Sequence, residues 1–297
     1  MFSKKFKSIV IAFILTITAA FTVTACGSKS SSRTDGKVIK IGTTEASQDY
    51  WKPFQEAAKK RGITIEPVSF SDYTQPNQAL DQNQVDLNLF QHIAFLADYN
   101  VKNNKNLTPI GSTYVVPLSL YSTKYKKPSE IPENGKVAIP NDPTNQARAL
   151  LVLQKAGLIK LKDGGNILST PADITSKKIT VQTVDAAQTA ANLKSVDAAA
   201  INNNFASDAN LDQNTVIFKD DPNSDEAKPY VNVIVSRPED KDNKDYQKVV
   251  EAYHDPEVQK AVAAQSKNTS VEVKSKQSDL QDTLKKQEDV VKQASSK

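Results

Sequence analysis

The sequence predicts an α/β fold, because short β-branched runs alternate with helical patterns from residue 37 onward. The first elements are a strand over residues 38–41, a helix over 49–61 that stops at Gly62, and a strand over 63–70. Strands that alternate with helices bury both faces of a mostly parallel sheet. Such open sheets bind ligands where strand carboxyl ends meet helix amino ends, so a site is expected at those junctions.

The middle of the chain continues the alternation. The helix expected over residues 143–156 carries both end signals, with Pro143 in its first turn and Gly157 just past its end. There is no repeat of fixed period and no glycine-rich phosphate loop, so the sequence gives no support for nucleotide binding. The other strands and helices are expected over residues 87–90, 92–103, 136–139, 179–181, 186–193, 198–201 and 231–235.

The C-terminal region has a helical pattern throughout. Residues 246–253 and 258–264 predict two amphipathic helices, and residues 278–294 predict a third that is highly charged. A charged run of this kind is usually a solvated face. We therefore expect a solvated face here and not a partner site, and we leave the role of the tail from residue 274 unassigned.

The first 25 residues have the three-part order of a secretory signal, with lysines at positions 4, 5 and 7, an apolar run over residues 9–21, and small residues at 23–25. The small residues stand directly before Cys26, the only cysteine, and this resembles the lipobox of bacterial lipoproteins. The resemblance implies that residues 1–25 are removed and that Cys26 is lipidated, which anchors the protein on the extracytoplasmic face of the cell membrane. The alternative is an uncleaved transmembrane anchor, but four threonines interrupt a run that barely reaches the ~20 residues needed to span a bilayer.

The rest of the chain is long enough to fold around its own core. Residues 26–36 are serine-rich and polar, so they predict a flexible tether. With one cysteine no disulfide can form within the chain, and the core must hold the fold. Beyond residue 25 the chain has 35 basic and 34 acidic residues, and this balance gives no reason to expect a nucleic-acid partner.

The inventory of reactive residues favours a binding protein over an enzyme. The chain has two histidines, and its single cysteine is assigned to lipid, so we expect no metal site. Acidic pairs occur at Asp220-Asp221 and Asp225-Glu226, but they lie in loop-like sequence where carboxylates are normally solvated. No serine lies in a Gly-x-Ser-x-Gly turn. We therefore expect no catalytic residues and no cofactor.

Aromatic, amide and guanidinium side chains gather at the ends of the predicted strands. Arg148 lies near the start of the helix over 143–156, and arginine suits a carboxylate because its planar fork donates two parallel hydrogen bonds. By position alone Arg148 could also be an ordinary surface arginine. The other candidates at strand ends are Tyr73, Phe90, His92, Phe95 and Asn145.

These residues lie in segments that resemble the NlpA family, the methionine-binding lipoproteins of ABC importers. The resemblance runs from about residue 38 to about residue 264 and is strongest over residues 137–145, Val-Ala-Ile-Pro-Asn-Asp-Pro-Thr-Asn, with Arg148 three residues on. A second matching stretch covers residues 157–164. Shorter matches are Phe70-Ser71-Asp72-Tyr73, Phe90-Gln91-His92, Ile201-Asn202 and Pro229-Tyr230-Val231-Asn232.

The resemblance implies a role for each candidate. Arg148 would clamp the ligand carboxylate, Asn202 and Asn232 would hydrogen-bond the α-amino and carboxylate groups, and Asn145 would support them. The side-chain pocket, where a thioether gains from aromatic ring edges, would be walled by Tyr73, Phe90, His92, Phe95 and Tyr114. Taken singly, Phe90 and Phe95 could be core aromatics, His92 a structural histidine and Asn232 a strand-end amide.

The fold implied is the two-lobed type II periplasmic-binding-protein architecture, with the ligand in the cleft between lobes. The first lobe would comprise residues 37–115 and 234–297, and the second residues 116–233. Closure about the two crossings would trap the ligand, and the closed form is what an ABC permease with its ATPase would recognise. The expected protein is a monomer that captures methionine and delivers it to the importer.

One departure leaves the ligand open. After Phe90-Gln91-His92 the family usually continues with Lys-Pro-Tyr, whereas this chain has Ile93-Ala94-Phe95 and lacks that hydroxyl. D-methionine, a methionyl dipeptide or another small organosulfur amino acid therefore stays an alternative ligand. Two rivals from other classes are a surface adhesion protein that uses the charged tail and an extracellular hydrolase, for which the sequence offers no nucleophile.

Overall fold

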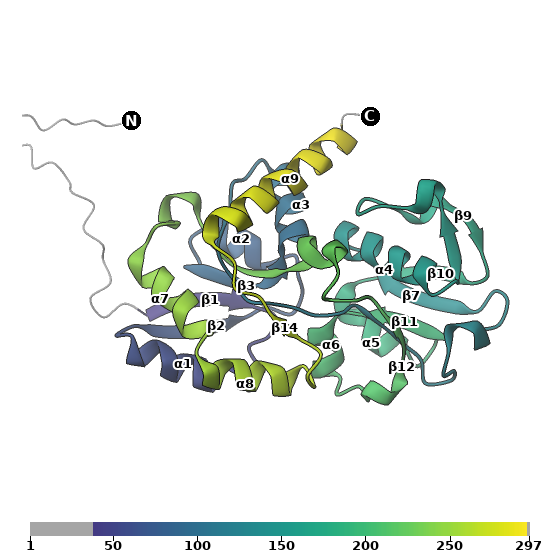
Figure 1. Ribbon diagram of the computed structural model, residues 1–297, viewed down its shortest axis with the longest axis horizontal. Helices are drawn as coiled ribbons and strands as arrows, with labels where there is room; N and C mark the ends of the chain where they lie inside the picture. The colour runs from purple at the N-terminus through teal and green to yellow at the C-terminus, as the bar shows by residue number, and fades with distance from the viewer. Residues whose placement is uncertain (1–37, 296–297) are drawn as a thin grey trace, which may run out of the picture. The chain divides into compact units, whose positions relative to one another are not determined.

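The computed structural model describes residues 38–295, which form two lobes, each built on a five-stranded sheet (Figure 1). The predicted signal, the lipidation site at Cys26 and the tether lie outside the described residues. Within residues 38–295 no helix is both long enough and apolar enough to cross a membrane.

The sheet of the first lobe has the strand order β2 (Thr64–Ser69), β1 (Val38–Thr43), β3 (Leu87–His92), β13 (Asn232–Ser236) and β4 (Thr108–Ser112). Strand β1 runs parallel to β2 and β3, while β13 runs antiparallel to β3 and β4. Asn232 and Val233, which the sequence analysis placed at the end of the second lobe, pair within this sheet.

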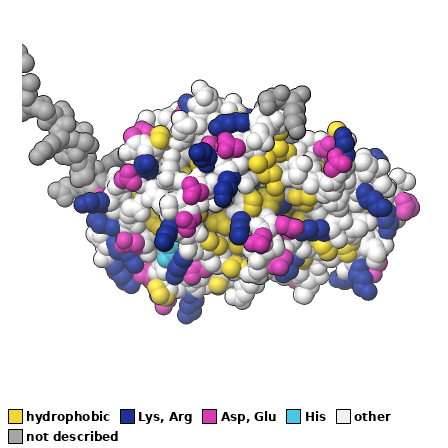
Figure 2. Space-filling view, turned by 45° about the horizontal axis from the view of Figure 1, so that its top comes forward, with side chains coloured by type: hydrophobic (Ala, Val, Ile, Leu, Met, Phe, Trp, Pro, Cys, Tyr) yellow, Lys and Arg dark blue, Asp and Glu magenta, His cyan; other side chains and the backbone are white. Residues whose placement is uncertain are grey.

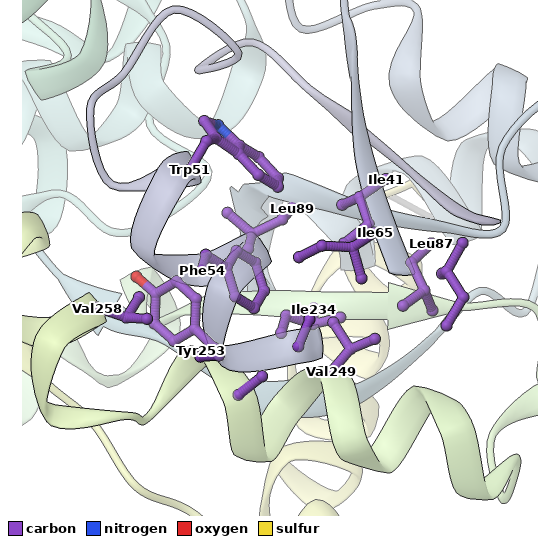
Figure 3. Packing of buried hydrophobic residues seen from close by; sticks show 14 of the residues in the cluster. Ile41, Trp51, Phe54, Ile65, Leu87, Leu89, Ile234, Val249, Tyr253 and Val258 are labelled. Atoms are coloured by element: carbon purple, nitrogen blue, oxygen red, sulfur yellow. The ribbon is translucent and has the colours of Figure 1, made fainter. Parts of the chain in front are cut away.

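Helices cover both faces of the first sheet. One face carries α1 (Trp51–Lys60), α7 (Lys244–Tyr253) and α8 (Pro256–Gln265), and the other carries α2 (Pro76–Asp81), α3 (Ile93–Asn103) and α9 (Gln277–Ser295). Side chains on a strand alternate between faces, so Ile234 packs with the first group of helices and Val233 with the second. In the core between the sheet and helices α1, α7 and α8, the rings of Phe54 and Tyr253 meet edge to face, with their centres 5.4 Å apart (Figure 3).

The sheet of the second lobe has the order β10 (Thr180–Val184), β7 (Lys136–Pro140), β11 (Ala198–Ile201), β6 (Ser119–Tyr121) and β12 (Val216–Lys219). Helix α4 (Pro143–Lys155) packs on one face, and α5 (Thr189–Asn192) and α6 (Asn203–Asp208) pack on the other. A separate antiparallel pair, β8 (Ile159–Leu161) and β9 (Ile174–Lys177), extends the α4 side.

Two segments carry the chain between the lobes. The first follows β5 (Tyr114–Val115), which pairs with β14 (Val271–Glu272), and leads into β6. The second follows β12 and includes a 3-10 helix, Asp225–Tyr230, before β13. Asp220 begins this second segment and accepts a hydrogen bond from the backbone N–H of Leu118 in the first, at 2.9 Å. The two crossings are thus joined to each other.

The sequence analysis expected a solvated face in the charged C-terminal segment. The structure shows that one side of this segment also packs against the first lobe. Helix α9 lies along α3 in Figure 1 and buries Leu280, Leu284 and Val291 on one side. The two leucines belong to the same core cluster as α2 and α3. Five of the 19 residues of α9 are apolar, so polar and charged residues dominate its composition even though one face is packed.

Candidate functional site

A pocket with a cavity of about 40 Å³ lies between the two lobes. Small-molecule sites often lie in clefts between domains. All nine residues predicted from the sequence line it: Tyr73, Phe90, His92, Phe95, Tyr114, Asn145, Arg148, Asn202 and Asn232. Their contact with a ligand stays a prediction.

Three strand-to-helix junctions bring polar groups to the pocket. His92 ends β3 and caps α3, where its Nδ1 accepts a hydrogen bond from the backbone N–H of Phe95 at 3.1 Å. Asp142 caps α4 by accepting from the backbone N–H of Asn145 at 3.0 Å. Asn202 occupies the corresponding position between β11 and α6. These polar groups therefore lie where the carboxyl ends of strands meet the amino ends of helices, which is the place that the strand pattern predicts for a site.

Arg148, in the second turn of α4, is buried and held by protein groups. Its Nε donates to Asp220 Oδ2 at 2.7 Å, and its Nη2 donates to Asp220 Oδ1 at 3.2 Å and to the carbonyl of Val116 at 2.8 Å. Its guanidinium carbon lies 4.2 Å from the ring centre of Tyr230. Arg148 is thus not an ordinary surface arginine, and the fork expected to grip a ligand is used by Asp220.

The third guanidinium nitrogen of Arg148, Nη1, is not used by Asp220 or Val116. Among residues 38–295, Nη1 has no hydrogen-bond acceptor, although Arg148 lines the pocket. Each terminal nitrogen of an arginine guanidinium carries two N–H donors. The structure therefore leaves one nitrogen of a fixed, charged group for a carboxylate in the pocket.

Asn145 organises its neighbours through its side-chain amide. Its Oδ1 accepts from Asn202 Nδ2 at 2.9 Å and contacts His92 Nε2 at 3.4 Å, while its Nδ2 donates to Asp142 Oδ1 at 2.9 Å. The Oδ1 of Asn202 is buried and has no partner among the described residues. A buried acceptor without a donor is costly, so a ligand N–H would satisfy Asn202.

His92 is neutral at physiological pH. Burial, with a smaller contribution from the charge of Arg148, lowers its pKa to about 3. Because its Nδ1 accepts the Phe95 backbone N–H, the ring proton resides on Nε2, which points to Asn145. His92 therefore acts here as an uncharged hydrogen-bonding and aromatic wall.

An aromatic cluster forms the apolar side of the pocket. The ring of Tyr73 lies 6.1 Å from that of Phe90, 5.9 Å from that of Phe95 and 5.0 Å from that of Phe205, centre to centre. Phe90 and Phe95 also meet edge to face at 5.8 Å. Edges of several rings converging on one space suit an apolar or thioether side chain.

Hydrogen bonds join the two lobes around this pocket. Tyr73 donates to Asn204 Oδ1 at 2.5 Å, and Gln48 Nε2 donates to Asp208 Oδ1 at 2.6 Å. The contact between His92 and Asn145 also crosses from one lobe to the other. The structure is thus a closed arrangement in which both walls meet.

Comparison with known proteins agrees with this geometry. The family model described as NlpA lipoprotein matches residues 39–274. The chain belongs to the NlpA lipoprotein family. The predicted family and the predicted two-lobed binding-protein fold are therefore confirmed.

Individual NlpA relatives cover most of the chain. A Haemophilus influenzae protein named probable D-methionine-binding lipoprotein MetQ is 39% identical over 253 residues, which are 82% of this chain and 91% of the relative. The substrate-binding protein of a methionine transporter from Streptococcus pneumoniae is 41% identical, with a TM-score of 0.74 over 80% of this chain and 95% of that one. A nutrient-binding protein from Burkholderia cenocepacia, solved with bound methionine, is 38% identical, with a TM-score of 0.74 over 79% of this chain and 99% of that one.

The NlpA-type pocket also contains residues that the sequence analysis missed. Asp220 was expected to be a solvated loop carboxylate, but it pairs with the buried Arg148. Nothing local in the sequence indicates this pairing, because the two residues are 72 positions apart. Asn203 and Asn204 were detectable, since they continue the run of asparagines that begins at Asn202. The pocket-lining residues not predicted are Glu45, Gln91, Val116, Asn203 and Asn204.

Proposed function

We propose that this protein captures L-methionine, or a close relative of it, outside the cytoplasm and delivers it to an ABC importer. One observation carries the proposal. Arg148 Nη1 and the buried Asn202 Oδ1, a donor and an acceptor without protein partners in the described chain, line one pocket with an aromatic wall. These groups complement a carboxylate, an ammonium and an apolar side chain, which together make a zwitterionic amino acid.

The interaction energies are sufficient for scavenging. Burying a methionine-sized side chain contributes about 1.5–3 kcal/mol. Each hydrogen bond to a charged group contributes about 1.5–3 kcal/mol. Three or four such bonds, after the cost of association, allow a micromolar Kd, which corresponds to about 8 kcal/mol.

Lobe closure supplies the signal to the transporter in this proposal. A ligand held by Arg148 and Asn202 on the second lobe and by the Tyr73–Phe90–Phe95 wall on the first binds the closed form more tightly than the open one. The ligand then shifts the population towards closure, and the permease recognises the closed form. The protein acts as a monomer, since one chain contains both walls.

Membrane attachment is part of the same proposal. Lipid on Cys26 would hold the protein at the extracytoplasmic face of the membrane, with residues 26–36 as a tether. Relatives described as lipoproteins support this placement. In the expressing cell, Cys26→Ser should move the protein from the membrane fraction to the soluble extracytoplasmic fraction; full retention in the membrane would rule out this anchor.

The ligand assignment is tested by calorimetry and thermal shift with L-methionine, D-methionine and methionyl dipeptides. A ligand that binds only the folded protein raises the Tm. We expect L-methionine to give the largest shift and Arg148→Ala to remove it; because this variant leaves Asp220 without its partner, circular dichroism must show it folded. If D-methionine, named in the MetQ relatives, gives the larger shift, the stereochemistry is reversed. No shift with any of them would refute the substrate class.

A further inference from the structure

Glu45 is a buried carboxylate at the floor of the candidate pocket. It follows β1, is 8% exposed, and lines both this pocket and a smaller adjoining cavity. Its backbone is fixed, because its N–H donates to Thr43 Oγ1 at 3.0 Å and its carbonyl accepts from Trp51 Nε1 at 2.8 Å. Glu45 therefore occupies a built position, not a mobile loop.

Two tyrosines hold the carboxylate in place. Tyr114 donates its hydroxyl to Glu45 Oε1 at 2.7 Å, and Tyr50 donates to Oε2 at 2.9 Å. An ionised carboxylate has about four lone-pair positions, so about two remain for another donor. Both hydroxyl donors favour the negatively charged form over a protonated one that would have to donate in return.

No cation of the described chain pairs with this carboxylate. Burial raises the pKa of Glu45 above its usual value, because the hydroxyls of Tyr114 and Tyr50 lower it only in part and the charge of Asp208 raises it further. Arg148 is engaged by Asp220 instead. A buried negative charge with tyrosine hydroxyls alone is poorly compensated, and a positive group entering the pocket would correct this.

We propose that Glu45 is the counterion for the ammonium group of the ligand and that it restricts the pocket to ligands that carry a protonated amine. This inference rests on the proposed function and refines it, because Asn202 Oδ1 would accept one ammonium N–H and Glu45 would neutralise the charge. A ligand without the amine would leave the carboxylate buried and unpaired. Sites of this kind discriminate strongly against analogues that lack the matching group.

The test compares two ligands on three proteins by calorimetry. The ligands are L-methionine and its analogue without the amine, 4-(methylsulfanyl)butanoate. The proteins are the wild type, Glu45→Gln, and the control Glu56→Gln, which makes the same chemical change at an exposed position of α1. Glu56 lines neither the candidate pocket nor the adjoining cavity. A thermal melt of each variant shows whether it is folded.

We expect Glu45→Gln to weaken L-methionine binding by about 10- to 100-fold, as for loss of a charged hydrogen bond. The same variant should bind the analogue as well as the wild type does, or better. Glu56→Gln should stay within about threefold of the wild type for both ligands. This pattern isolates the pairing of carboxylate and amine from any general loosening of the pocket.

Other results would overturn the inference. Equal L-methionine affinity in the wild type and Glu45→Gln would show that Glu45 does not pair with the amine. Equal weakening of both ligands would show a structural role. If the wild type binds neither ligand, the proposed function itself is wrong and the role of Glu45 falls with it, which distinguishes the two failures.

Discussion

Arg148 and Asp220 form a two-point ion pair across the base of the second lobe, with Nε–Oδ2 at 2.7 Å and Nη2–Oδ1 at 3.2 Å. The same Arg148 donates to the carbonyl of Val116, and the same Asp220 accepts from the N–H of Leu118. The pair therefore ties α4 to both segments that cross between the lobes. A ligand carboxylate that binds Arg148 would bind a group already connected to the hinge.

The first prediction concerns Asp220→Asn. The amide cannot accept both guanidinium hydrogen bonds or balance the charge of Arg148, so we expect ligand binding to weaken by about 10- to 100-fold. Stability should fall by about 3 kcal/mol or more, because a buried charge loses its partner. Calorimetry and chemical denaturation measure the two effects.

Asp221→Asn is the matched control for this prediction. Asp221 is exposed, and its carboxylate accepts from the backbone N–H of Asn223 at 2.9 Å. It should change affinity by less than about twofold and stability by about 0.5 kcal/mol or less. An Asp220→Asn variant that behaves like Asp221→Asn would mean that the pair does not position Arg148.

The second prediction concerns acid stability and His92. Between its unfolded pKa of 6.5 and its folded pKa of about 3, the unfolded chain holds a proton on His92 that the folded chain does not. The unfolding free energy contributed by this group therefore falls as the pH drops from 6.5, by roughly 1.4 kcal/mol per unit. By pH 4.5 the loss is about 2–3 kcal/mol.

His92→Asn isolates this effect, since asparagine can still cap α3 but does not titrate. The stability difference between the wild type and the variant should shift in favour of the variant by about 2–3 kcal/mol between pH 7.5 and 4.5. Denaturant titrations at several pH values provide the comparison. A difference that does not change with pH would show that His92 is protonated in the folded protein.

Much of the fold follows from local patterns. The helix expected over residues 143–156 is α4, Pro143–Lys155, because proline and glycine mark its ends. The strand expected over residues 198–201 is β11, Ala198–Ile201. The short strands β5 and β6 were not predicted, since two or three residues carry no detectable alternation and depend on tertiary partners. The packed face of α9 was missed for a related reason, because its apolar residues are outnumbered by charges.

Some residues of the candidate site could be predicted from local sequence patterns, and others could not. Residues at strand-to-helix junctions, such as His92 and Asn202, could be placed from the strand pattern and the family resemblance together. Residues that act through distant pairing could not, and Asp220 is the clearest example. Glu45 follows an expected strand, but a single acidic residue in a loop gives no sign of burial until Tyr50 and Tyr114 are seen to enclose it.

The third prediction concerns lobe closure. Gln48 Nε2, in the first lobe, donates to Asp208 Oδ1, in the second, at 2.6 Å, and Gln48 does not line the candidate pocket. Gln48→Ala should therefore favour the open form and weaken ligand binding by about three- to tenfold without altering ligand contacts. Small-angle scattering should show a larger radius of gyration without ligand and the wild-type value at saturation.

Gln84→Ala is the control for closure, because Gln84 donates its hydrogen bond to Gln82 on the surface of the first lobe. It should leave both affinity and scattering unchanged. If Gln48→Ala also leaves both unchanged, the hydrogen bond to Asp208 does not contribute to closure.

The final prediction concerns the C-terminal helix, which lies beyond the segment matched by the family model. Leu280 and Leu284 are 3% and 7% exposed and pack in the cluster that contains Leu96 of α3. Truncating either leucine to alanine should destabilise the protein by about 2–5 kcal/mol. Val290 is 37% exposed and lines a hollow together with Leu151 and Tyr230. Apolar side chains also gather on the face of the molecule that Figure 2 shows. Val290→Ala should cost about 0.5 kcal/mol or less. Thermal and denaturant unfolding of the three variants decides the matter: equal, small effects would mean that α9 is an independent appendage, whereas the expected contrast makes it part of the first lobe.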